Sequence, residues 1–332
     1  MVNIIEGQKP LLHTLVRMAG LRPVLVELEP GTVMHFWAPK HRLPSQKKTS
    51  AAAITVDKST PVDVPESNTT IANTTAALSR PSKNRARRIW PSRNRPKPAI
   101  VLVHGFASEG IVTWQFQFGV LVSDYDVYIP DLFFFGKSTT VQPDRSPEFQ
   151  AGCVARALDM LGVERCHVVG FSYGGMVAFK LAEARPSLVR SLVVTGSVIT
   201  MTDSINEASL TRLGAASSAD LLLPETLERL KALLKMSMYK KLWFPDRFYK
   251  DYLEVCSNNY SFSFFYFYVR QLGENTSLVG ISKAGHLLHM ERPCAFNRYL
   301  KRFLSYVDSH HDDDNNNNNN NDNNNNDNDN AY

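Results

Sequence analysis

The sequence predicts an α/β fold in which a mostly parallel sheet is covered by helices on both faces. Two observations lead to this prediction. Short runs of β-branched and other apolar residues alternate along the chain with longer helical patterns, and such alternation is typical of parallel strands joined by helical crossovers. The chain has 332 residues, and without the two polar stretches 41–98 and 308–332 roughly 250 remain, which suits one domain.

The predicted elements follow one another in the order that such a fold requires. The chain opens with an amphipathic helix near 8–19 and a hairpin over 24–39 that turns at Pro30-Gly31. Strands and helices then alternate, and helix 146–162 begins after a serine that can cap it. The further strands are predicted at 99–106, 126–132, 166–171, 191–197 and 277–282, and the further helices at 174–184 and 292–307.

Composition divides the chain into six segments. Residues 203–256 have an amphipathic helical pattern without a strand pattern, which indicates a helical cap inserted between strands of the core. The segments are an N-terminal helix and hairpin (1–40), a basic disordered insert (41–98), the first part of the core (99–202), a helical cap (203–260), the C-terminal part of the core (261–307) and an Asn/Asp-rich disordered tail (308–332).

Charge and cysteine usage exclude several classes of function. The insert has twelve lysines or arginines against three acidic residues, so the pI near 8.9 describes a loop and not a nucleic-acid-binding face. The four cysteines lack metal-ligand spacing. No apolar run near the N-terminus is long enough for a membrane span or a signal peptide. We therefore expect a cytoplasmic protein whose first helix packs on the domain or contacts a membrane surface weakly, in an oligomeric state that the sequence leaves open.

The stretch Gly170-Phe171-Ser172-Tyr173-Gly174 carries the strongest chemical signal in the chain. It lies between the predicted strand 166–171 and a helix, where a G-x-S-x-G sequence forms a sharp turn that exposes the serine oxygen. Side chains two residues before and after the serine would collide, so both positions need glycine. The pattern predicts Ser172 as a nucleophile and the amide of Tyr173 as a donor to an oxyanion.

Two further motifs stand at the carboxyl ends of strands. His104-Gly105-Phe106 follows the first core strand, where the amide of Phe106 can serve as the second oxyanion donor and His104 organises the turn. Ala284-Gly285-His286 follows the last predicted strand, at the same sheet edge as the nucleophile. His286 is therefore the expected general base, whereas His289 is expected to be an ordinary helix or loop residue.

These three motifs resemble those of the α/β-hydrolase fold superfamily, and the chain is similar to plant monoacylglycerol-lipase-like proteins and to meta-cleavage-product-hydrolase-like proteins. The resemblance covers 99–200 and 277–307, and the cap matches more loosely. It implies an α/β-hydrolase fold with a helical cap, a nucleophile followed by a histidine in chain order, and a mechanism that needs no metal or organic cofactor.

The acid that should orient His286 is the difficult member of the triad. In this family it usually follows the penultimate strand, yet residues 253–306 contain no aspartate. We therefore expect that a strand-loop-helix unit is missing from this version of the chain. Asp203, just past strand 191–197, is the favoured substitute, followed by Glu274 and by Asp246 in the cap. The absence of any functional acid stays open, and it would lower kcat by on the order of 10⁴.

The sequence thus predicts a serine hydrolase that acts on carboxylic esters, including monoacylglycerols or other lipid-like esters, through an acyl-enzyme on Ser172. C–C bond hydrolysis is an alternative, although relatives with that activity carry asparagine where Phe171 stands here. Epoxide hydrolases and haloalkane dehalogenases use an aspartate nucleophile, which argues against both. A hydrolase-fold protein that binds a small ligand without turnover is the alternative from another class.

Overall fold

The sheet has seven strands in the order β3-β1-β2-β5-β4-β6-β7. Its four strands β5, β4, β6 and β7 are parallel, and the hairpin β1–β2 joins them through an antiparallel pairing of β2 with β5. The strands are β1 (Leu21–Glu29), β2 (Thr32–Pro39), β3 (Ile54–Val56), β4 (Ala99–Val103), β5 (Asp126–Pro130), β6 (Cys166–Phe171) and β7 (Val189–Thr195). The computed structural model describes residues 4–43, 54–56, 96–106, 108–197, 211, 226–239, 245–247, 249–250 and 276–324.

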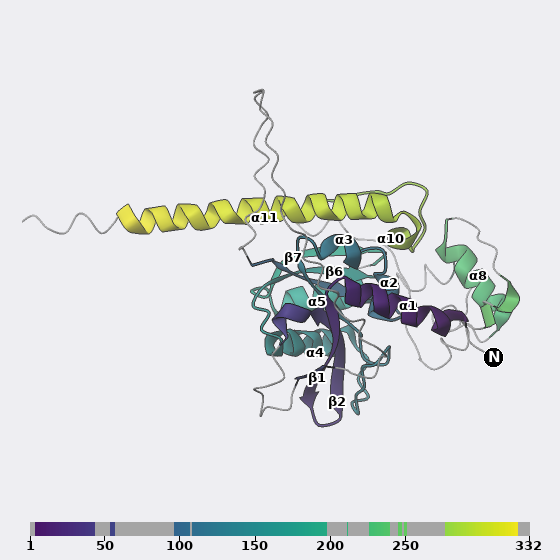
Figure 1. Cartoon of the computed structure of the whole chain (residues 1–332). Helices are drawn as coiled ribbons and strands as arrows, with labels where there is room; N and C mark the ends of the chain where they lie inside the picture. The colour runs from purple at the N-terminus through teal and green to yellow at the C-terminus, as the bar shows by residue number, and fades with distance from the viewer. Residues whose placement is uncertain are drawn as a thin grey trace, which may run out of the picture.

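Helices cover both faces of this sheet, as the sequence predicts. One apolar core lies between the sheet and α4 and α5, and a second lies between the sheet and α1, α2, α3 and α11 (Figure 1). None of the described helices is both long and apolar enough to cross a bilayer. The helices are α1 (Ile4–Met18), α2 (Gly110–Thr113), α3 (Phe118–Leu121), α4 (Pro147–Met160), α5 (Tyr173–Ala184), α8 (Leu227–Ser237), α10 (Leu288–Glu291) and α11 (Pro293–Asn324), with a short 3-10 turn at Lys40–Arg42.

Local sequence signals account for the ends of several elements. The Ser146 hydroxyl accepts the Phe149 amide at 3.1 Å and so caps α4, which has proline at its first position. The β1–β2 hairpin turns at Gly31, whose φ of 80° suits glycine. β4, β5 and β6 are buried along almost their whole length, which is why they read as continuous apolar runs.

The structure corrects the prediction for two segments. Ile54–Val56, inside the insert predicted to be disordered, forms β3 and pairs antiparallel with β1, because a β-branched triplet can add to an open sheet edge. The predicted strand 277–282 is not a strand: residues 276–280 are exposed and make no ladder. Among the described residues β7 is the outermost strand at that end of the sheet, and 277–282 does not pair with it.

The final helix also differs from the expected boundary at 307. α11 begins at Pro293 and continues to Asn324, past the far edge of the domain in Figure 1. Asp308, predicted to open a disordered tail, is held by the folded core. Its carboxylate accepts the Tyr125 hydroxyl at 2.8 Å, faces the His167 ring nitrogen Nε2 at 3.1 Å and pairs with Arg190 at 3.2 Å. These contacts hold α11 against the start of β6. The Asn/Asp-rich composition of the tail predicted disorder and gave no sign of them.

Candidate active site

Ser172 occupies the sharp turn between β6 and α5. Its backbone has φ 53° and ψ −121°, a conformation that residues other than glycine rarely adopt. The turn needs bare backbone on both sides: a Cβ at Gly170 would lie 2.5 Å from the carbonyl oxygen of Gly174, and a Cβ at Gly174 would collide with the carbonyl oxygen of His104. The glycines therefore permit the strained turn at the end of β6.

His286 lies against this serine, although 114 positions separate the two residues in the chain. Its Nε2 atom is 3.2 Å from the Ser172 hydroxyl oxygen. The backbone amide of His286 donates to the carbonyl of Ser237 at 2.7 Å, at the end of α8. Burial lowers the pKa of His286 to about 4, so the ring is neutral at pH 7 and can accept a proton.

The ring of Phe171 packs against the ring of His286. The Phe171 ring is 6% exposed and lies 4.9 Å, centroid to centroid, from His286 and 4.3 Å from His289. From the sequence, the identity of Phe171 argued only against C–C bond hydrolysis, and this contact was not predicted. The residue before a G-x-S-x-G serine ends a buried strand, and that position is the signal that could have indicated it.

His289 belongs to the packing around the site. It lies in α10, is fully buried, and its ring stands 5.1 Å from that of Trp114. Neither ring nitrogen makes a well-formed hydrogen bond to a described residue. Burial and the neighbouring His286 lower the pKa of His289 to about 3, and a weak backbone interaction with Thr113 offsets only a small part of this. His289 is therefore a neutral core residue.

The loop expected to form the oxyanion site is held by His104. The His104 Nδ1 atom bonds to the Gly105 carbonyl at 2.7 Å, and its Nε2 accepts the Leu132 amide at 2.8 Å. These two backbone partners define the neutral tautomer with the proton on Nδ1. Burial lowers the pKa of His104. Because both nitrogens are occupied, His104 organises the loop and has no free nitrogen for proton transfer.

Phe106 and Tyr173, the two residues expected to donate amides, have side chains anchored away from Ser172. The Phe106 ring packs edge-on against Phe135 at 5.4 Å, and the Tyr173 hydroxyl donates to the Arg145 carbonyl at 2.8 Å. Gly105 lies directly beside Ser172, since a Cβ on Gly105 would be 3.1 Å from the Cβ of Ser172. The Phe106 amide follows Gly105 in the chain and so lies near the serine. The Tyr173 amide belongs to the first turn of α5, where helix amides lack intrahelical acceptors.

A buried carboxylate behind this loop was missed by sequence reasoning. Asp131 accepts the Gly110 amide at 2.9 Å and faces His35 Nδ1 at 2.8 Å. Burial alone would raise the pKa of Asp131, but the hydrogen bond and charge of His35 outweigh it and the pKa is lowered. The ionised carboxylate thus ties the start of α2 to the end of β5. An aspartate directly after a buried strand was the signal for it.

Comparison with known proteins agrees with the fold. A family model described as "alpha/beta hydrolase fold" matches residues 98–221, the part that carries β4, β5, β6, β7 and the serine turn. This chain is an α/β-hydrolase-fold protein. The structure of a bacterial membrane phospholipase A is similar, with a TM-score of 0.55 and 18% identity over 92% of this chain and 95% of that one. At such low identity the likeness concerns the fold alone.

Curated relatives of this α/β-hydrolase-fold protein match over a shorter stretch. Mouse epoxide hydrolase 4 is 32% identical over 104 residues, which are 30% of this chain and 28% of the relative. The pimeloyl-[acyl-carrier protein] methyl ester esterase of Aeromonas hydrophila is 34% identical over 100 residues, which are 30% of this chain and 38% of the relative. The match therefore spans about a third of these relatives, so it supports a hydrolase with esterase-like relatives and identifies no substrate.

The candidates for the triad acid of this α/β-hydrolase-fold protein have different outcomes. Asp203 and Glu274 lie outside the described residues. The Asp246 carboxylate is 65% exposed and pairs with Lys231 of α8 at 2.6 Å, so it acts as a surface ion-pair partner. The structure also shows which strand end faces the base: a Cβ on Gly196, just past β7, would be 3.2 Å from His286 Nδ1.

Proposed function

We propose that this protein is a serine hydrolase that cleaves carboxylic esters, including monoacylglycerols or other lipid-like esters, through an acyl-enzyme on Ser172. The observation that carries the proposal is the 3.2 Å approach of His286 Nε2 to the hydroxyl oxygen of a serine in a strained strand-to-helix turn. A nucleophile and a base within hydrogen-bond reach are the minimum equipment for acyl transfer.

The proposed reaction has two halves. In the first, neutral His286 takes the proton of the Ser172 hydroxyl while the oxygen attacks the ester carbonyl carbon, and the amides of Phe106 and Tyr173 stabilise the resulting oxyanion. The tetrahedral intermediate collapses: the C–O bond to the alcohol breaks, and the alcohol leaves with the proton from His286. In the second half, His286 takes a proton from water while the water oxygen attacks the acyl carbon; the bond from that carbon to the Ser172 oxygen then breaks, His286 returns the proton to Ser172, and the carboxylic acid leaves.

Asp203 is our proposed triad acid. It follows β7 by eight residues, and the Nδ1 edge of His286 stands above the end of that strand, beside Gly196. A carboxylate must reach Nδ1 if it is to hold the imidazole in its working tautomer. Glu274 precedes 276–280, which is exposed, and that position offers less support for the same role.

An ester substrate fits the nucleophile better than an epoxide does. Epoxide hydrolases use an aspartate nucleophile, and a serine stands at that position here. The esterase among the relatives supports ester chemistry.

The test is labelling of the full-length protein with a fluorophosphonate probe that reacts with activated serines. Labelling is expected in the wild type and should disappear in Ser172→Ala and His286→Ala. The chain offers a matched control: Ser191 lies 2.7 Å from His167 Nδ1, and His167 faces Asp308, but this Ser-His-Asp arrangement is at the opposite sheet edge without a strained turn. Ser191→Ala should therefore keep full labelling.

Hydrolysis of p-nitrophenyl esters of increasing acyl length, and of a monoacylglycerol, then tests the substrate class. Asp203→Asn should lower the rate by on the order of 10⁴, and Glu274→Gln should leave it near the wild-type value. A cooperatively folded protein that takes no label would contradict the hydrolase proposal and favour a ligand-binding protein. Labelling with no preference for long acyl chains would contradict only the lipid-like substrate.

A further inference from the structure

Helix α1 presents large apolar side chains to solvent. Leu11, Leu15 and Met18 are 65%, 44% and 79% exposed, and their spacing of four and three residues puts them on one face of the helix. The adjoining face is buried: Leu12 and Val16, each one residue further along the helix than Leu11 and Leu15, pack in the core shared with α2, α3 and α11. The helix therefore has two apolar faces, one of which packs on the domain.

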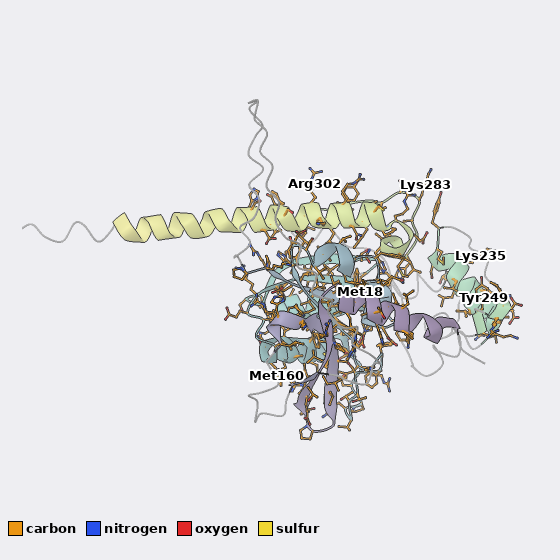
Figure 2. The ribbon with its side chains drawn as sticks, in the orientation of Figure 1. Met18, Met160, Lys235, Tyr249, Lys283 and Arg302 are labelled. Carbon is orange, nitrogen blue, oxygen red and sulfur yellow. The ribbon has the colours of Figure 1, made fainter. Side chains whose placement is uncertain are left out.

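Basic residues gather at the C-terminal end of this exposed stripe. Arg22 donates to the carbonyl of Arg17 in the last turn of α1 at 2.9 Å. The amide of Lys40 donates at 2.9 Å to the carbonyl of Gly20, two residues past Met18, and Lys40 is exposed. Figure 2 labels Met18 at this end of the helix. An apolar stripe with basic groups at its end is complementary to the surface of a membrane that contains anionic lipids.

The other end of α1 is joined to the proposed active site. Lys9 forms an ion pair with Glu109, which lies between the loop of His104–Phe106 and helix α2. Glu109 is thus paired with a lysine of α1 itself. A surface that held α1 would hold the loop beside Ser172 close to the same surface.

We propose that the face of α1 formed by Leu11, Leu15 and Met18 docks on an anionic lipid bilayer, with Arg22 and Lys40 facing the lipid headgroups. The helix would lie in the plane of the interface, because its buried face stays packed on the domain. This inference goes beyond ester hydrolysis: it describes where the enzyme works, and a lipid-like ester would reach the site from the bilayer.

The experiment is co-sedimentation of the full-length protein with vesicles of phosphatidylcholine alone and of phosphatidylcholine with phosphatidylglycerol. We expect binding to the anionic vesicles, weakened at least tenfold in the triple variant Leu11→Ser/Leu15→Ser/Met18→Ser. Lys40→Gln should weaken it by about fivefold, since one basic residue near an anionic surface contributes about 1 kcal/mol. Val141→Ser, which removes an apolar side chain that is 72% exposed on a different loop, should bind like the wild type.

Three results would overturn the proposal. The first is that the wild type binds neither kind of vesicle, and the second is that the triple variant binds as well as the wild type. The third is that the wild type is a dimer that does not bind vesicles, while the triple variant is a monomer. The last result would make the stripe a contact between two copies of the chain. Ser172→Ala should bind vesicles normally, and the triple variant should hydrolyse p-nitrophenyl butyrate in solution at the wild-type rate, so failure of docking and failure of catalysis are distinguishable.

Discussion

His286 is expected to remain an effective base well below neutral pH. Burial lowers its pKa from the ordinary 6.5 to about 4, because the charged imidazolium loses more by leaving water than the neutral ring does. Only the neutral imidazole can take the proton of Ser172. The rate at which Ser172 is acylated should therefore stay near its maximum as the pH falls, until the pH approaches 4.

The effect is already large at pH 5.5, and it grows as the pH falls further toward 4. At pH 5.5 an imidazole with a pKa of 4 is about 97% neutral, whereas one with a pKa of 6.5 is about 9% neutral, so the two cases differ about tenfold in rate. The assay is the rate of fluorophosphonate labelling between pH 4.5 and 8. Ser172→Ala supplies the background, and far-UV circular dichroism at each pH checks that the protein stays folded.

An inflection at pH 6.5 or higher would refute the reasoning. It would mean that a carboxylate close to Nδ1 outweighs burial, whereas an inflection near pH 4 requires that the proposed contact with Asp203 raises the pKa of His286 by less than burial lowers it. In that case Asp203→Asn should move the inflection to lower pH, and the same variant should leave it unchanged if burial dominates. The measurement therefore also tests whether the proposed triad has a third member.

Two further predictions concern stability. His289 stays neutral in the folded protein, where its pKa is about 3, while in the unfolded chain it takes up a proton below about pH 6.5, so this residue lowers the stability as the pH falls. Between pH 7 and pH 5 the free energy of unfolding, measured in urea, should therefore fall by about 2 kcal/mol less in His289→Leu than in the wild type. An equal fall in the two proteins would contradict the assignment of His289 as a neutral core residue. Asp308→Ala leaves the hydroxyl of Tyr125 and the ring of His167 without their hydrogen-bond acceptor, and it should lower the free energy of unfolding by on the order of 1–3 kcal/mol. Asp124→Ala, which removes an exposed ion pair with α11, should cost less than about 1 kcal/mol, and equal costs would show that Asp308 is no anchor.

Local patterns were sufficient for the parallel core. The predicted strand 166–171 has the same bounds as β6, and the predicted helix 146–162 contains α4, which ends two residues earlier. These elements are signalled by neighbouring residues: a buried β-branched run, a serine cap and a proline at the first helical position. The juxtaposition of Ser172 and His286 was also expected, although one reason for it was wrong, because the strand predicted before His286 does not form.

Interactions between segments distant in the chain decided the elements that the sequence pattern predicted wrongly. The apolar run 277–282 satisfies the pattern of a strand, but a strand exists only when a neighbour accepts its hydrogen bonds, and none of the described strands flanks it. Ile54–Val56 lies in a polar insert and becomes a strand because β1 offers an open edge. Asp308 belongs to the core because Tyr125 and His167, more than a hundred residues away, donate to it.

The sequence by itself determined which residues could perform chemistry: a serine in a glycine-rich turn, a histidine after it in the chain, and a loop that can supply amides. The tertiary structure decided the state of those residues. The pKa of His286 depends on the burial of its ring beside Phe171, and the fixed tautomer of His104 depends on the Leu132 amide. Burial and hydrogen bonding are properties of three-dimensional neighbours, and the order of residues along the chain does not contain them directly.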